Sequence, residues 1–173
     1  MTHQLNFIYN DSDWICPSEY PDLSKATEIA IDLETKDPNI KTKGPGWATF
    51  DGHIVGFAVA ALGQQWYFPI AHDAGGNMDL SITCAWMQDI LKTDATKIFH
   101  NASYDVGWLL VNGFEIRGKI VDTMIAAAII NENRFSFSLN ACAKDYLGEI
   151  KNETFLNEKA KEWGIDPKAD MGK

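Results

Sequence analysis

The sequence predicts a mixed α/β domain built on one sheet. Short apolar runs typical of buried strands alternate along the chain with segments of helical period. Two of the early runs are separated only by a turn, which predicts an antiparallel β-hairpin, whereas the later runs alternate with helices, which predicts parallel strands joined by crossovers. With 173 residues, 46% of them hydrophobic, the chain has the size of one domain with a substantial core.

The first half of the chain is predicted to start a three-stranded antiparallel sheet. A buried strand is expected at residues 28–33, followed by a Gly- and Pro-rich loop at residues 43–47. Strand-like runs at residues 53–60 and 65–70 flank the turn at 62–64, and we expect them to pair as a hairpin.

The second half is predicted to alternate helices with short strands. Asn112-Gly113 is a typical helix C-terminus, and Asp122-Thr123 is a typical helix start. Because parallel strands need long connections, this order predicts strands joined by helical crossovers. The expected elements are helix 79–92, strand 97–99, helix 102–111, strand 119–121, a helix running to about residue 130 and helix 138–147.

Composition limits the function classes. No apolar run approaches the roughly 20 residues of a membrane span, and the N-terminus lacks a signal-peptide profile, so neither a membrane partner nor secretion is expected. The three cysteines are far apart, which predicts no zinc site or disulfide framework and favours a reducing, cytoplasmic compartment. The net charge of −9 argues against extended binding to duplex phosphates, so any nucleic-acid site is expected to be local.

Two carboxylates, Asp32 and Glu34, stand one residue apart at the end of the first predicted strand. Since strand side chains alternate between faces, both project from the same side. Two like charges side by side repel, and a hard divalent cation such as Mg²⁺ or Mn²⁺ would relieve the repulsion. The alternative is a strand that ends in two solvated acids before the turn at residues 36–39.

A second group of polar residues, His100 to Asp105, lies where a buried strand passes into a helix. Asn101 and Asp105 are four residues apart and share a helix face. Ligands collect at the carboxyl ends of strands in α/β sheets, so Asp105 could meet Asp32 and Glu34 if their strands are neighbours. Alternatively, Asn101 is a plain N-cap and Asp105 a solvated acid.

In combination, these segments resemble the motifs of the DnaQ-like 3′–5′ exonucleases. Asp-x-Glu-Thr at residues 32–35 and His-Asn-x-x-x-Asp at 100–105 resemble the first two exonuclease motifs. The segments at 121–124 and 138–148 look like further conserved stretches of the same family. The likeness is greatest to the proofreading domain of family A DNA polymerases, phage ones included, and to the related RNase D group. It implies a ribonuclease H-like fold over about residues 28–150.

The resemblance implies hydrolysis of a phosphodiester with two Mg²⁺ or Mn²⁺ ions about 3.5–4 Å apart. By resemblance, Asp32 would bridge both ions, and Glu34 would bind the ion that holds the attacking water. Asp105 would support the other ion, partly through water.

The resemblance also implies a frayed, single-stranded DNA 3′ end as substrate, with a polymerase domain in cis or in trans. Leu33 and Thr35 would contact the terminal nucleotide, and Asn101 would contact the strand near the scissile phosphate. His100 and Tyr104 are further substrate-binding candidates by the same likeness. RNA remains an alternative substrate, because these motifs do not distinguish the sugars.

Other polar and aromatic residues are interpreted as structural. Asp122 is expected to cap a helix, and His53 and His72 are expected to be surface or turn residues, since no partner stands at metal-ligand spacing. The tryptophans on apolar stripes are expected to pack in the core rather than stack on bases; they are Trp66, Trp86 and Trp108.

The sequence departs from the family after Gly148. The family's third motif, Tyr-x-x-x-Asp or His-x-x-x-Asp on a last helix, has no counterpart, because neither Asp166 nor Asp170 has a Tyr or His four residues before it. We therefore expect a loop-rich lead-in at residues 1–27, the exonuclease domain at 28–150 and a polar tail at 151–173 that stops before the catalytic helix. Two alternatives to a DNA exonuclease stay open, a catalytically silent fragment that binds a 3′ end and an RNase D-like exoribonuclease.

Overall fold

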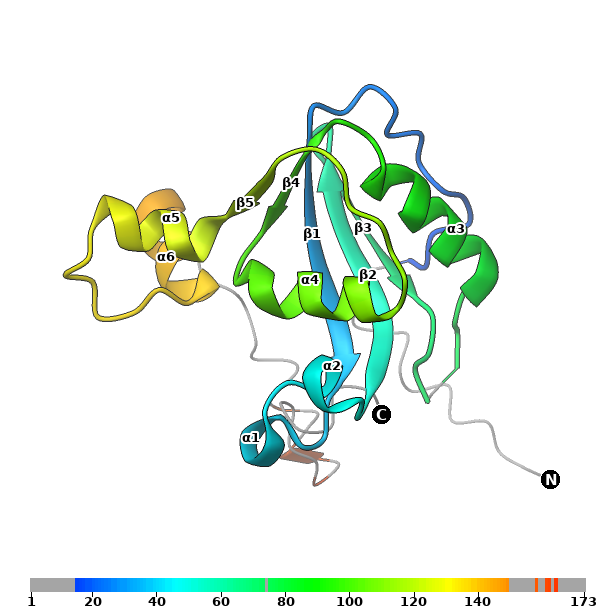
Figure 1. The fold of residues 1–173 in the computed structure, drawn as a ribbon, viewed down its shortest axis with the longest axis horizontal. Helices are drawn as coiled ribbons and strands as arrows, with labels where there is room; N and C mark the ends of the chain where they lie inside the picture. Colours follow the sequence, from blue (N-terminus) through cyan, green and yellow to red (C-terminus); the bar gives the residue numbers. More distant parts are fainter. Residues whose placement is uncertain (1–14, 74, 150–157, 159–160, 163, 165–173) are drawn as a thin grey trace.

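A five-stranded mixed sheet in the order β3-β2-β1-β4-β5 forms the centre of the computed structural model (Figure 1). The structure describes residues 15–73 and 75–149, together with residues 158, 161, 162 and 164. The strands are β1 (Glu28–Lys36), β2 (His53–Ala61), β3 (Gln64–Pro69), β4 (Thr96–Phe99) and β5 (Ile120–Asp122). The helices are α1 (Ile40–Lys43), α2 (Gly46–Thr49), α3 (Leu80–Leu91), α4 (Ala102–Val111), α5 (Thr123–Ile130) and α6 (Leu139–Leu147).

The strand directions confirm the predicted fold class. β1, β2 and β3 pair antiparallel, whereas β4 pairs parallel to β1 and β5 parallel to β4. The α3 and α4 helices lie in the crossovers, as parallel pairing requires. The strand that carries Asp32 and the strand that leads into Asp105 are therefore direct neighbours.

The predicted hairpin is present, with a two-residue turn. Leu62 and Gly63 both have positive φ, 53° and 74°. A turn with this geometry matches the right-handed twist of the two strands that it joins.

The predicted loop at residues 43–47 is wrong in part, because α1 and α2 occupy much of this connection. Each helix has a single turn of four residues, too short to show an apolar period in the sequence. β1 also runs three residues beyond the predicted strand, since Lys36 still pairs with His53 of β2. The end of β1 and the two short helices lie together, close to one end of α4 (Figure 1).

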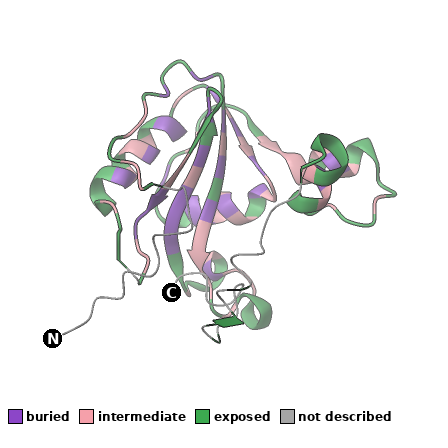
Figure 2. Ribbon diagram, turned by 180° about the vertical axis from the view of Figure 1, so that it is seen from behind, coloured by how far each residue is buried: buried purple, intermediate pink, exposed green. Residues whose placement is uncertain are grey.

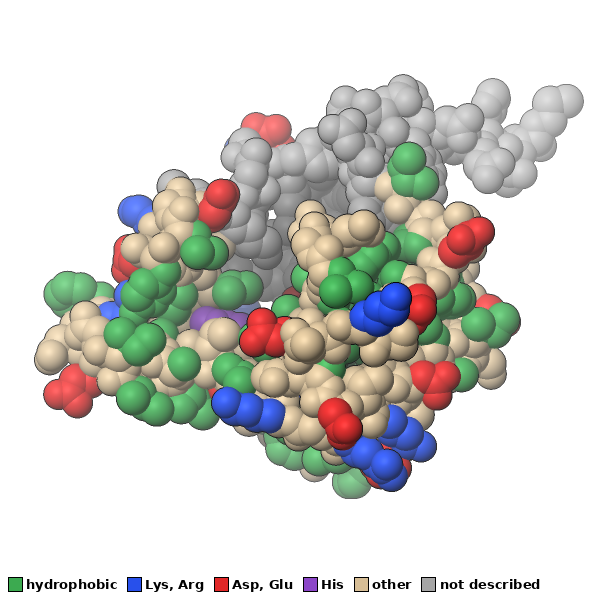
Figure 3. Space-filling view, turned by 90° about the horizontal axis from the view of Figure 1, so that it is seen from above, with side chains coloured by type: hydrophobic (Ala, Val, Ile, Leu, Met, Phe, Trp, Pro, Cys, Tyr) green, Lys and Arg blue, Asp and Glu red, His purple; other side chains and the backbone are tan. Residues whose placement is uncertain are grey.

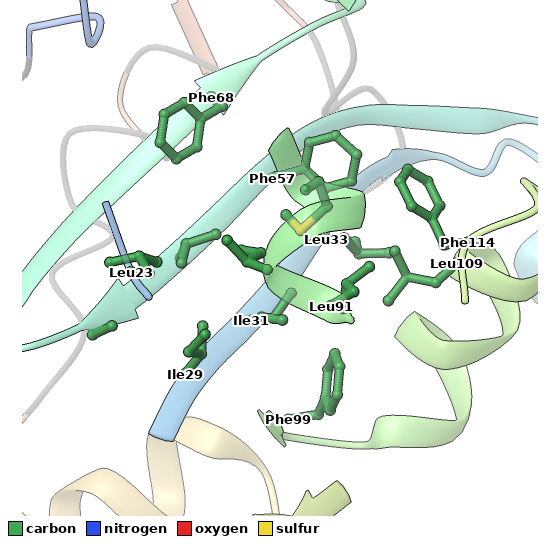
Figure 4. Close-up of a cluster of buried hydrophobic side chains, with 14 of the residues drawn as sticks. Leu23, Ile29, Ile31, Leu33, Phe57, Phe68, Leu91, Phe99, Leu109 and Phe114 are labelled. Atoms are coloured by element: carbon green, nitrogen blue, oxygen red, sulfur yellow. The ribbon is translucent and has the colours of Figure 1, made fainter. Parts of the chain in front are cut away.

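The core lies between one face of the sheet and the helices α3 and α4 (Figures 1 and 4). Ile29, Ile31 and Leu33 of β1 point into it and are at most 6% exposed. Residues 15–27 contain no helix or strand, yet Leu23 is only 2% exposed and belongs to the same core. The labelled members in Figure 4 are Leu23, Ile29, Ile31, Leu33, Phe57, Phe68, Leu91, Phe99, Leu109 and Phe114.

The opposite face of the sheet is left open by the described helices (Figure 2). A pocket of about 460 Å³ lies on it, lined by residues from four strands and from the start of α5 and α6. Small side chains such as Ala30, Ala58 and Ala60 line part of this pocket, and Asp32 stands among them.

The α5 and α6 helices form a lobe beyond β5, at the edge of the sheet (Figure 1). Ala127 is the buried residue of α5 and Cys142 that of α6. Hydrophobic side chains gather on the surface of this lobe (Figure 3); Ile129 is 80% exposed and Ile130 is 70% exposed. The lobe therefore contributes little to the main core.

The described residues cover the tail predicted at 151–173 at only four positions, and Asp166 and Asp170 lie outside them. The predicted last helix is confirmed as α6, which ends at Gly148 in the left-handed conformation. Within the described part of the chain, no helix is both long and apolar enough to cross a membrane.

Candidate active site

Asp32 and Glu34 project from the open face of the sheet, as the strand alternation predicts. Their neighbours Ile31 and Leu33 are buried in the core, whereas Asp32 is exposed and Glu34 half-buried. A bulge between Glu34 and Thr35 shifts the register with β2 directly after the pair. Bulges at such positions redirect side chains near functional sites.

Asp105 lies on the first turn of α4 and is almost completely buried, at 3% exposure. Its Oδ1 atom accepts a hydrogen bond of 2.9 Å from the backbone N–H of Leu33. This contact places Asp105 beside the strand that carries Asp32 and Glu34. Asp105 is therefore not the solvated helix acid of the alternative interpretation.

The environment of Asp105 raises the pKa of its carboxyl group to about 7. Burial is the largest cause, and the negative charges of Asp32 and Glu34 act in the same direction against the lowering effect of the Leu33 N–H. The three carboxylates thus lie within electrostatic range of one another.

This donor set fits a hard divalent cation, because carboxylate oxygens are the ligands that Mg²⁺ and Mn²⁺ prefer. In the described part of the chain, however, no three Asp, Glu, His or Cys side chains already converge as a metal-binding cluster. Asp105 directs one oxygen to the Leu33 N–H, and like charges favour separation of the carboxylates.

Thr35 and Tyr104, two predicted substrate-binding residues, are in contact. The Thr35 hydroxyl bonds the Tyr104 hydroxyl at 2.8 Å, and the Tyr104 hydroxyl donates to Asp37 Oδ2 at 3.0 Å. Asp37 Oδ2 also accepts from the Gly46 N–H at 2.8 Å, which joins the network to α2. Burial raises the pKa of Tyr104, and the hydrogen bond from Tyr104 to Asp37 acts in the same direction.

Leu33 contributes to the site through its backbone. Its side chain is 6% exposed and packs in the core, so it faces away from the side of the sheet where Asp32 stands. Its N–H is the donor that holds Asp105. The predicted contact of Leu33 with a terminal nucleotide stays a prediction, and on this placement it would involve the backbone rather than the side chain.

Asn101 has a left-handed backbone conformation, with φ of 69°, and its side chain does not cap α4. Its Oδ1 atom accepts instead from the Ser103 hydroxyl at 3.1 Å. A non-glycine residue in this conformation is uncommon and is often held by its surroundings. The alternative that Asn101 acts as a plain N-cap is thus wrong for its side chain.

His100 is oriented by a chain of hydrogen bonds. The Thr123 hydroxyl donates to the Phe99 carbonyl at 3.0 Å, so it accepts from His100 Nδ1, 2.9 Å away. The other ring nitrogen, Nε2, is buried and has no hydrogen-bond partner among the described residues. His100 lines the same pocket as Asp32.

Asp122 is structural, as predicted, and it caps two helices. Its Oδ1 atom accepts from the N–H groups of Met124 and Ile125 at the start of α5. Its two oxygens also accept from the N–H groups of Asn101 and Ala102 at the start of α4. Burial opposes ionisation most strongly, yet the backbone N–H groups together lower the pKa of Asp122 below its usual value.

The remaining structural predictions are also confirmed. His53 is exposed, and Trp108 is 3% exposed in the core. Trp66 and Trp86 are partly buried and pack against the core cluster.

Sequence reasoning missed Asp37 and Tyr67. His72 lies in the loop after β3, as expected of a surface or turn residue, but it is half-buried and its bond to Tyr67 was not foreseen. Asp37 belongs to the Thr35 and Tyr104 network, while the Tyr67 hydroxyl bonds His72 Nε2. Sheet register or loop folding brings each of these residues to its hydrogen-bond partner. No local pattern in the sequence could therefore have identified them.

The model of the 3′–5′ exonuclease domain of family A DNA polymerases matches residues 20–171 of this chain. The chain belongs to this exonuclease family. The chain is 34% identical to a DNA-directed DNA polymerase of Pseudomonas phage M6 over 172 residues, and this alignment covers 95% of the chain. It is also 29% identical to the DNA polymerase DpoZ of Salmonella phage PMBT28 over 147 residues, and this alignment covers 84% of the chain.

The exonuclease domain spans only part of these relatives, 26% of the first polymerase and 21% of the second. Its fold is shared with solved nucleases. Escherichia coli RNase D, an exoribonuclease, superimposes with a TM-score of 0.54 at 18% identity, covering 76% of this chain and 31% of that chain. Brucella melitensis NrnC with bound Mg²⁺ gives a TM-score of 0.55 at 16% identity, covering 87% of this chain and 81% of that chain. These likenesses confirm the ribonuclease H-like fold.

Proposed function

We propose that this exonuclease domain removes nucleotides from the 3′ end of single-stranded DNA, as the proofreading part of a DNA polymerase in a phage-infected bacterial cell. The observation that carries the proposal is the 2.9 Å hydrogen bond between Asp105 Oδ1 and the Leu33 N–H. It brings the carboxylate of the second motif to the strand that bears the two carboxylates of the first.

Asp32, Glu34 and Asp105 are the residues that would hold two Mg²⁺ or Mn²⁺ ions. The bound ions would polarise the scissile phosphate and lower the pKa of the attacking water. Binding of the ions would also offset the repulsion among the three carboxylates, and it would favour the ionised form of Asp105.

The residues around the carboxylates are suited to hold the strand end. Thr35 and Tyr104, fixed by Asp37, stand beside the end of β1 and offer hydroxyl groups to a terminal nucleotide. The open face of the sheet supplies an apolar pocket that reaches Asp32 and His100. Apolar and aromatic surfaces of this kind accept unpaired bases, which favours a single-stranded substrate. The net charge of −9 disfavours extended binding to duplex phosphates, so it agrees with binding confined to the end of one strand.

The test is the shortening of 5′-labelled single-stranded DNA by the full 173-residue chain, with Mg²⁺, with Mn²⁺ and with a chelator. We expect metal-dependent shortening from the 3′ end, lost in Asp32→Ala. Equal activity in the wild type and in Asp32→Ala would contradict the proposal. Metal-dependent binding of the strand without turnover would support the alternative of a silent 3′-end binding fragment.

A matched RNA oligomer decides the substrate class. The likeness to RNase D concerns the fold alone, so the phage polymerase relatives are the reason to expect a preference for DNA. Faster shortening of RNA than of DNA would favour an RNase D-like exoribonuclease.

A further inference from the structure

Tyr67 of β3 lies in the same cross-strand row as Asp32. Asp32 pairs with Ala58, and Ala58 pairs with Tyr67, so the three side chains project from one face of the sheet. Ala58 between them is small. The Tyr67 ring therefore stands on the same open face as the carboxylates of β1, and both Asp32 and Tyr67 line its pocket.

The Tyr67 hydroxyl occupies the space that a side chain at position 56, next to Glu34, would take. Glu34 pairs with Gly56 of β2, and a Cβ on Gly56 would lie 2.1 Å from the Tyr67 hydroxyl oxygen. Cβ atoms of directly opposite residues are about 4.5–5.5 Å apart. The hydroxyl is thus within reach of the Glu34 carboxylate, and burial together with the charge of Glu34 raises the pKa of Tyr67.

His72 fixes the Tyr67 hydroxyl in this place. Tyr67 Oη and His72 Nε2 are hydrogen bonded, and the two rings meet edge to face at 5.8 Å between centroids. The His72 backbone is itself held, because it exchanges two hydrogen bonds of 2.8 Å with the Asn77 side chain. An ion pair of 2.9 Å between Lys36 and Asp73 joins the same loop to the end of β1.

We propose that Tyr67 is a positioning residue for Glu34. Its hydroxyl, which His72 fixes over Gly56, holds the Glu34 carboxylate in the orientation that binds a divalent cation. The inference rests on the proposed metal site. Groups that hydrogen-bond a ligating carboxylate typically change metal affinity about 10–100-fold when they are removed. Tyr67→Phe keeps the ring over Gly56 and removes only the hydroxyl, so it isolates this contribution.

The experiment measures Mn²⁺ affinity by isothermal titration calorimetry on the full chain, without substrate. We expect Tyr67→Phe to bind Mn²⁺ about 10-fold more weakly than the wild type. The matched control is Tyr20→Phe, which loses a hydroxyl bonded to Thr83 Oγ1 on the α3 side of the sheet. Its Mn²⁺ affinity is expected to stay unchanged, although its thermal stability falls.

A second variant, His72→Phe, keeps the Tyr67 hydroxyl and removes its fixed partner. We expect a smaller loss of Mn²⁺ affinity, and thermal unfolding without metal shows whether either variant is folded. If one variant does not fold, the other decides. Wild-type Mn²⁺ affinity in a folded Tyr67→Phe or His72→Phe would overturn the role of Tyr67. If Asp32→Ala loses Mn²⁺ affinity in the same experiment, the proposed metal site itself stands. Absence of Mn²⁺ binding by the wild type would overturn the proposed metal site and this inference together.

Discussion

Asp105 Oδ1 accepts a 2.9 Å hydrogen bond from the backbone N–H of Leu33, 72 residues earlier in the chain. β4 pairs with β1 only as far as Ala30, so the edge of β1 beyond that point needs another acceptor. Asp105 supplies this acceptor from the first turn of α4. The same carboxylate therefore completes the hydrogen bonding of β1 and enters the acidic site.

Asp105→Asn separates these two roles. The amide oxygen can still accept from the Leu33 N–H, so we expect the fold to be retained and the metal-dependent nuclease rate to fall at least about 100-fold. Nucleotide release and thermal unfolding measure the two effects. In the control Asp105→Leu, the buried N–H loses its acceptor, which costs about 1–3 kcal/mol of unfolding free energy. Wild-type activity in Asp105→Asn would contradict a role of this carboxylate in catalysis.

The raised pKa of Asp105 predicts a pH dependence of stability in the metal-free protein. Its pKa is about 7 in the folded state against a usual value of 3.8. Between these values the folded state binds a proton that the unfolded state has lost, so stability from Asp105 falls as the pH rises towards about 7. Thermal unfolding of the wild type and of Asp105→Asn from pH 4 to pH 8 should show a decline that the variant lacks. Parallel curves would refute the assignment.

Asp122→Ala is predicted to destabilise two helices at once. The carboxylate accepts from backbone N–H groups at the start of both α4 and α5. A single cap contributes about 1 kcal/mol, so we expect a loss of about 2 kcal/mol in denaturant unfolding. Asp79→Ala is the matched control, because Asp79 caps only α3 through Ile82 N–H, and it should lose about half as much. Equal losses in both variants would be inconsistent with a double cap.

Gly107→Ala is predicted to destabilise the protein although alanine favours helices. A Cβ on Gly107 would lie 2.5 Å from the Trp47 ring, which packs on α4 at this point. Overpacking costs about 1–3 kcal/mol, against a gain of about 1 kcal/mol in helix propensity. Chemical denaturation measures the balance. In a Trp47→Ala background the clash is absent, so the same substitution should become neutral or stabilising; a penalty that persists there would contradict the clash.

Much of the fold could be predicted because its signals are local. α4 begins and ends at the predicted residues, and β1 alternates buried and exposed side chains as its sequence indicates. The short helices α1 and α2 were missed, since a single turn carries no apolar period. Their position depends on contacts outside the helices themselves, namely the hydrogen bond from Gly46 to Asp37 and the packing of Trp47 on Gly107.

Sequence reasoning predicted which residues form the candidate site, but not how they are arranged. The motifs predict Asp32, Glu34 and Asp105 as site residues through their likeness to the exonuclease family, and the family match agrees with that likeness. The sequence could not show that Leu33 donates its backbone N–H to Asp105, although the strand alternation does place the Leu33 side chain in the core.

The sequence by itself determined that Asp32 and Glu34 share one face of a strand and that Asp122 begins a helix, because both follow from the period of the local backbone. Only the tertiary structure decided that Asp105 reaches Leu33, that Tyr104 joins Thr35 to Asp37, and that the Tyr67 hydroxyl lies over Gly56 beside Glu34. These partners are far apart in the chain or on different strands, so sheet register and helix packing bring them together.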